Sequence, residues 1–210
     1  PVLEKHDREQ VEVYCYANVQ HPDYVTARLQ QKVEAWRDIH GLSEDQASAL
    51  IRADAMDVLV NLDGHTDAGI TLFARRNAPV QVSYLGYVNT TGLSSVDYLL
   101  TDRISEPDTF FDIETEPRQT RQRFHSERLV SLGDTFFTYR PPDTDIQPAA
   151  LPAAANGDVT FGSFNKAPKL NAGVLDLWAA VLRATPDSRL LLQGRMFSTQ
   201  HGKDKIAEHF

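Results

Sequence analysis

The chain has 210 residues, with 41% apolar and 24% charged residues, which is typical of one large or two small soluble globular domains. Its net charge of −8 argues against a general nucleic-acid-binding protein, because phosphate contacts need clustered Lys and Arg. No apolar run approaches the ~20 residues that span a bilayer, and no signal peptide is visible. With a single cysteine, which fits a reducing compartment, we expect a cytoplasmic protein with no nucleic acid or membrane as partner.

The first 140 residues alternate between strand and helix patterns. Runs of β-branched and aromatic residues predict strands at 11–17, 57–61, 80–85, 96–100 and 128–132. Helical spacing of apolar residues predicts helices at 23–36, 43–55 and 68–76, while 37–42 is open between strand and loop. Ser43 and Gln46 form the pattern of a capping box. This rhythm indicates βαβ units in a parallel sheet, with 57–61 as a buried strand.

The rhythm is interrupted twice. Residues 105–124 contain Arg118, Arg121 and Arg123 among Gln and Thr, a pattern that predicts a solvated loop. Residues 141–157 include four prolines and predict a linker.

A second set of βα units follows the predicted linker. The sequence predicts a strand at 158–163, a helix from the cap Asn171 to Arg183, a strand at 189–192 and a helix that runs to Phe210. We therefore predict an α/β fold with a first domain over 1–140, nearly complete, and a second over 158–210, only begun.

A polar turn directly after the 57–61 strand is the first candidate site. It contains Asp63, Gly64, His65 and Thr66, and ligands bind at the carboxyl ends of strands in open α/β sheets. His65 could orient a ligand or transfer a proton there. A plain strand-to-helix turn, in which Gly64 adopts an unusual dihedral angle and Thr66 or Asp67 caps the helix, explains the same residues.

Two further loops follow predicted strands. The loop from Gly86 to Gly92 either closes a tight turn or lets backbone amides approach a ligand. The loop at 163–169 places Lys166 and Lys169 next to the start of a helix, where a phosphate would be favoured; both lysines could equally be solvated.

Common site motifs are absent from the sequence. It has no cysteine pair, no H-E-x-x-H motif and only scattered histidines, so we expect no metal. It also lacks the G-x-G-x-x-G and P-loop nucleotide motifs and the G-x-S-x-G nucleophile elbow.

Several motifs in one order nevertheless resemble a known family. They are DVLVNLDGHT, FARR-x-APVQ, LGY-x-x-T-x-G, DY-x-x-TD and F-N-x-x-x-K, spread between Val11 and about Leu192. Together they resemble the catalytic region of the bacterial O-linked N-acetylglucosamine (O-GlcNAc) transferases and their SPINDLY-like relatives.

The resemblance implies a glycosyltransferase of the GT-B type, in which two Rossmann-like domains face each other across a cleft. The donor would be UDP-GlcNAc, a substrate rather than a cofactor, and the acceptor a Ser or Thr hydroxyl of a protein or peptide. Family members usually carry upstream tetratricopeptide repeats that select their substrates.

The resemblance also implies site residues. The candidate catalytic residues are His65, for positioning at the cleft, and Lys169, which would stabilise the departing diphosphate. The candidate substrate-binding residues are Asp63, Gly64, Thr66, Gly86, Tyr87, Thr90, Thr91, Gly92, Asn165 and Lys166.

Both ends of the chain look cut from something larger, and the fragment alone is expected to be inactive. Two alternatives therefore stay open: a non-catalytic remnant that binds nucleotide or protein, and a protein O-fucosyltransferase of the same family that uses GDP-fucose.

Overall fold

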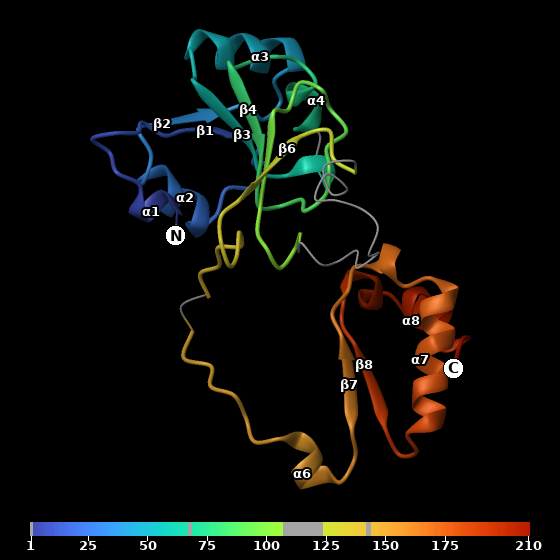
Figure 1. Cartoon of the computed structure of the whole chain (residues 1–210). Coiled ribbons are helices and arrows are strands. Elements are labelled where there is room, and N and C mark those ends of the chain that lie inside the picture. The colour runs from blue at the N-terminus through green and yellow to red at the C-terminus, as the bar shows by residue number, and fades with distance from the viewer. Residues whose placement is uncertain (1, 67–68, 107–123, 142–143) are drawn as a thin grey trace, which may run out of the picture. The chain divides into compact units, whose positions relative to one another are not determined.

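The computed structural model describes residues 2–66, 69–106, 124–141 and 144–210 (Figure 1). It contains two compact units, Pro1–Pro142 and Asp143–Phe210, and each is described by itself. The predicted boundaries, with a first domain over 1–140 and a linker over 141–157, stay a prediction.

Unit 1 contains two parallel sheets, as the alternating strand and helix patterns predict. One is four-stranded, in the order β3-β4-β5-β6, and the other pairs β1 with β2 (Figure 1). The strands are β1 Tyr14–Ala17, β2 Ala35–Asp38, β3 Val58–Asn61, β4 Val80–Ser83, β5 Tyr98–Thr101 and β6 Arg128–Ser131. Most of the predicted loop at 105–124 lies outside the described residues.

The prediction of a buried strand is wrong for one face of β3, which lies at an edge of its sheet. Leu59 and Asn61 are buried, whereas Val58 and Val60 on the other face are 50% and 42% exposed. Three consecutive apolar residues, Val58, Leu59 and Val60, put apolar side chains on both faces of the strand. Such a run is typical of a strand that is buried on both faces, so the sequence alone does not reveal the exposed face.

The helices of unit 1 described here are α1 Val2–Lys5, α2 Tyr24–Gln30, α3 Glu44–Ala53 and α4 Ile70–Phe73. The capping box at α3 is confirmed: the Ser43 hydroxyl accepts from the Gln46 amide, and the Gln46 side chain accepts from the Ser43 amide. The predicted helix over 23–36 is wrong in its second half. Trp36, which fits the helical spacing, instead lies on β2 opposite Cys15, because pairing with β1 overrides a local pattern.

The core of unit 1 lies where α3 and α4 meet β3. Ala47 and Ile51 of α3, Leu59 of β3, and Leu72 and Phe73 of α4 form one buried cluster. This packing covers one face of the edge strand β3.

Unit 2 repeats the parallel strand–helix–strand arrangement. Strands β7 Thr160–Ser163 and β8 Arg189–Leu192 pair in parallel, and α7 Ala172–Ala184 lies between them in sequence. The predicted cap is confirmed, since the Asn171 side chain accepts from the Val174 amide at 3.1 Å. The unit also contains α6 Pro152–Asn156, the 3-10 helices η2 Ala167–Lys169 and η3 Arg195–Ser198, and α8 Gln200–Ala207.

The helix α6 lies within the segment predicted as a linker, where Pro152 starts it and Gly157 ends it in a left-handed conformation. The predicted terminal helix up to Phe210 is α8, which begins at Gln200 and ends at Ala207.

The FARR-x-APVQ and DY-x-x-TD motifs serve the fold of unit 1. Gln81, fully buried, accepts from the Asn77 amide at 3.0 Å and donates to the Ser95 carbonyl at 2.8 Å. Asp97 accepts both from the Arg76 guanidinium and from the Gln81 amide. The buried polar side chains of these motifs therefore satisfy backbone groups between α4, β4 and β5.

Asp102, at the end of the second motif, ties β5 to the chain after β6. Its carboxylate accepts from the amides of Ser105 at 2.6 Å, Ile104 at 2.9 Å and Phe136 at 2.7 Å, and the residue is 3% exposed. The Ser105 amide is the largest cause that lowers the pKa of Asp102; burial opposes it, and the other two amides add to the lowering.

Asp102 therefore makes the stability of unit 1 depend on pH. Its folded pKa lies below the ~3.9 of an unfolded Asp, so between these two values the unfolded chain binds more protons. The contribution is complete above the unfolded pKa and is lost as pH falls through the folded pKa. Asp102→Asn removes this titrating carboxylate, so the free energy of unfolding of unit 1 should change less between acidic and neutral pH than in the wild-type protein.

Urea unfolding between pH 3 and pH 7 measures this, with Trp36 fluorescence reporting on unit 1 in a Trp178→Phe background. Exposed Asp57, whose side chain accepts no hydrogen bond from the described residues, provides the control Asp57→Asn. An Asp102→Asn protein that keeps the full wild-type pH slope would contradict the assignment.

Candidate functional site

The candidate site of unit 1 lies at the carboxyl ends of β3 and β4. The parallel register sets Asn61 opposite Ser83, so both strands end side by side. The polar turn after β3 and the loop after β4 therefore meet at one edge of the sheet, where open α/β sheets bind ligands.

The turn after β3 is organised by Asn61, which is 3% exposed. Its side-chain oxygen accepts from the amides of Asp63 at 2.9 Å and Gly64 at 3.0 Å. The chain then forms the 3-10 helix η1, Gly64–Thr66, in which the Thr66 hydroxyl donates to the Asp63 carbonyl at 2.6 Å. The turn is thus built by short-range hydrogen bonds, as its Asx-type sequence favours.

Two glycines let the turn and the loop touch. A Cβ on Gly86 would lie 2.0 Å from the Leu62 carbonyl oxygen, and a Cβ on Gly64 would lie 2.2 Å from the Tyr87 Cβ. Gly64 also has a φ of +54°, which favours glycine. No larger residue fits at either position without moving the backbone of one segment.

His65 bridges the turn and the loop. Its Nε2 lies 2.8 Å from the Thr91 carbonyl oxygen, and its ring contacts Tyr87 edge-to-face with centroids 5.1 Å apart. A carbonyl only accepts, so Nε2 is the donor and carries the proton of neutral His65. The Nδ1 lone pair remains available to accept a hydrogen bond from a ligand hydroxyl, since no described residue donates to it.

Glu127 holds the far end of the loop, and it is not among the residues predicted from the sequence. Its carboxylate, fully buried, accepts from the Thr91 amide at 2.6 Å, the Thr90 hydroxyl at 2.8 Å and the Thr91 hydroxyl. The contacts span 36 residues in sequence. In the sequence, Glu127 is a lone acidic residue immediately before β6. A solvated surface residue would give the same pattern, so the sequence does not predict these contacts.

The lysine turn of unit 2, 163–169, follows β7. Lys166 and Lys169 are both exposed, and the Lys169 amide donates to the Lys166 carbonyl at 3.0 Å within η2. The Asn165 side chain donates to the Ser163 hydroxyl at 3.2 Å. Two exposed cations thus precede the N-terminus of the 13-residue α7, where positive ends of peptide dipoles attract anions.

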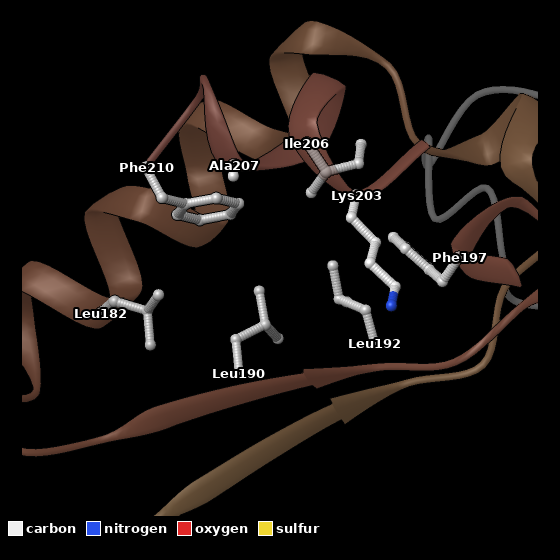
Figure 2. A pocket seen from close by; sticks show the side chains of 8 residues that line it. All are labelled: Leu182, Leu190, Leu192, Phe197, Lys203, Ile206, Ala207 and Phe210. Carbon is white, nitrogen blue, oxygen red and sulfur yellow. The ribbon is translucent and has the colours of Figure 1, made fainter. Parts of the chain in front are cut away.

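Unit 2 also contains an apolar hollow of about 310 Å³ between α7, α8, η3 and β8 (Figure 2). Figure 2 shows Leu190 and Leu192 of β8 facing Ile206 of α8 across it. None of the predicted site residues lines this hollow, and its apolar walls do not suit a charged nucleotide.

The predicted site residues therefore fall into two groups, one in each unit. The turn and loop of unit 1 bring together Asp63, Gly64, His65, Thr66, Gly86, Tyr87, Thr90, Thr91 and Gly92. The lysine turn of unit 2 contains Asn165, Lys166 and Lys169. Their roles in binding or catalysis stay predictions.

The described parts of the chain contain neither a cluster of metal-ligand side chains nor a membrane-spanning helix. No three His, Cys, Asp or Glu side chains there gather into a possible metal site. None of the helices there is long and apolar enough to cross a membrane.

Parallel strands joined by helices, with polar loops at the strand ends, define an α/β protein of the kind that binds ligands at its strand ends. The chain belongs to glycosyl transferase family 41, whose model matches residues 1–139. This membership confirms the resemblance seen in the motifs.

Curated relatives include plant proteins named as probable UDP-N-acetylglucosamine–peptide N-acetylglucosaminyltransferases. The SPINDLY protein of Petunia hybrida is 38% identical over 99% of this chain, and the SEC protein of Arabidopsis thaliana is 31% identical over 91%. The chain spans 21% and 19% of their lengths, respectively.

A solved structure confirms the α/β fold class. It is a mutant of the Thermobaculum terrenum O-GlcNAc transferase, which is 34% identical and superposes with a TM-score of 0.80 over 99% of this chain. The chain covers 37% of that structure.

Glycine substitutions test the contact between turn and loop. Gly86→Ala forces a methyl group onto the Leu62 carbonyl and should cost about 3 kcal/mol or more in the free energy of unfolding of unit 1. Gly92→Ala is the matched control, since Gly92 has a φ of +71° but open space around a Cβ, so only the dihedral strain of about 1 kcal/mol applies. Urea unfolding followed by Trp36 fluorescence measures both, and equal costs would argue against the close contact.

Proposed function

We propose that this chain is part of a protein O-GlcNAc transferase, which transfers N-acetylglucosamine from UDP-GlcNAc to Ser or Thr hydroxyls of proteins with inversion. The observation that carries the proposal is the likeness, over 99% of the chain, to a bacterial protein whose structure is named an O-GlcNAc transferase. The names of the plant relatives support the same activity. A cytoplasmic location belongs to this proposal.

Inverting transfer makes two demands on the protein. The acceptor hydroxyl attacks the anomeric carbon from one face while UDP departs from the other, so charge develops on the diphosphate and the hydroxyl loses its proton. Fixed cations stabilise the first of these changes. We assign this role to Lys169, with Lys166 and Asn165 beside it, because they precede the positive end of α7.

The turn and loop of unit 1 have the chemistry for hydroxyl-bearing ligands. His65 offers a lone pair at Nδ1 once Nε2 donates to the Thr91 carbonyl, and the Tyr87 ring lies beside it. We assign these residues, with the loop Gly86–Gly92, to positioning of the sugar or the acceptor hydroxyl.

A transfer assay tests the proposal on the protein that carries this chain. Labelled GlcNAc from UDP-GlcNAc should appear on a Ser/Thr peptide, and labelled fucose from GDP-fucose should not. Transfer from GDP-fucose alone would replace the proposal with the fucosyltransferase alternative, and binding of UDP without any transfer would favour the non-catalytic one.

Lys169→Ala tests the assigned cation in the same assay. Loss of the fixed charge should lower kcat by about 10²–10³-fold and weaken UDP binding measured by calorimetry. Arg183→Ala is the matched control, because Arg183 is an exposed cation at the opposite end of α7. Equal effects of both substitutions would contradict a specific role for Lys169.

A further inference from the structure

The buried carboxylate of Glu127 contacts two residues of the candidate site, Thr91 and Thr90. Its hydrogen bonds go to both the amide and the hydroxyl of Thr91, with the Thr90 hydroxyl as third donor. A buried charge is costly unless donors satisfy it, and these donors all belong to the loop after β4. These three hydrogen bonds therefore hold the loop against the carboxylate.

The charge state of Glu127 is consistent with this arrangement. Burial works to raise its pKa, but the hydrogen bonds from Thr91 and Thr90 outweigh burial and hold the pKa of Glu127 below its ordinary value. The carboxylate is therefore ionised at neutral pH and accepts from all three donors.

Thr91 passes this constraint to His65. The amide of Thr91 donates to Glu127, and the carbonyl of the same residue accepts from His65 Nε2 at 2.8 Å. Thr91 is 3% exposed, so its carbonyl has little access to water as an alternative donor. The direction of this carbonyl sets both the orientation of the imidazole and the nitrogen that carries its proton.

We propose that Glu127 is a positioning residue of the candidate site, which through Thr91 keeps the proton of neutral His65 on Nε2 and the Nδ1 lone pair available for a ligand hydroxyl. The ligand, a sugar or a Ser/Thr side chain, rests on the proposed function. The positioning itself rests on the hydrogen bonds alone.

Glu127→Gln tests the proposal, because it keeps the shape of the side chain but replaces one accepting oxygen with an NH₂ group that only donates. Long-range ¹H–¹⁵N NMR spectra distinguish the two nitrogens of His65, whose signals are identified by their loss in His65→Ala. The wild-type protein should show a protonated Nε2 and an unprotonated Nδ1. Glu127→Gln should mix the two tautomers, and unchanged His65 shifts would overturn the proposal.

Milder variants keep the test decisive if Glu127→Gln does not fold. Thr91→Val removes one hydroxyl donor while it retains the amide, and should shift the His65 signals in the same direction by a smaller amount. Thr91→Ser retains the hydroxyl and should restore the wild-type signals. Glu12→Gln, at an exposed glutamate, is the control for the loss of charge.

Kinetics separate the positioning from the proposed function. In the transfer assay Glu127→Gln should lower kcat about tenfold, and should lower it no further in a His65→Ala background. If the wild-type protein transfers no sugar, the proposed function fails while the NMR spectra still decide the positioning. If transfer occurs and the losses of kcat in Glu127→Gln and His65→Ala multiply in the double variant, the positioning role of Glu127 is contradicted while the proposed function stands.

Discussion

The contact between two backbone segments, the turn after β3 and the loop after β4, is the constraint on which the rest of the site depends. Gly86 lies against the Leu62 carbonyl and Gly64 lies under Tyr87, at separations that leave no room for a Cβ. This approach brings Thr91 within reach of His65. The parallel register of Asn61 with Ser83 makes it possible, because it ends both strands at the same level.

The loop is thus fixed at two places by different physical means. Near β4, shape complementarity between glycine backbone and the turn limits its position. At Thr90 and Thr91, charge-assisted hydrogen bonds to buried Glu127 limit the position of the loop. A loop held in this way is organised before any ligand arrives, so binding need not supply the free energy for ordering it.

Features set by neighbouring residues could be predicted from the sequence. The capping box at Ser43 and the cap at Asn171 depend on side chains three residues apart, and the parallel α/β class follows from the alternation of patterns. The sequence predicts Trp36 in a helix because it fits the helical spacing of apolar residues. In the structure it lies on β2, because β2 pairs with β1, and this pairing cannot be read from the neighbouring residues. Glu127 could not be found, because its partners lie 36 residues away.

Donor titration followed by backbone amide NMR tests the proposed function most directly, because it shows which strand-end loops of the chain contact a nucleotide sugar. Addition of UDP-GlcNAc should shift the amide signals of 165–169 in unit 2 and of 86–92 in unit 1, whereas UDP alone should affect mainly the lysine turn. Shifts confined to the apolar hollow beside Leu190 and Ile206, or to neither loop, would contradict the account.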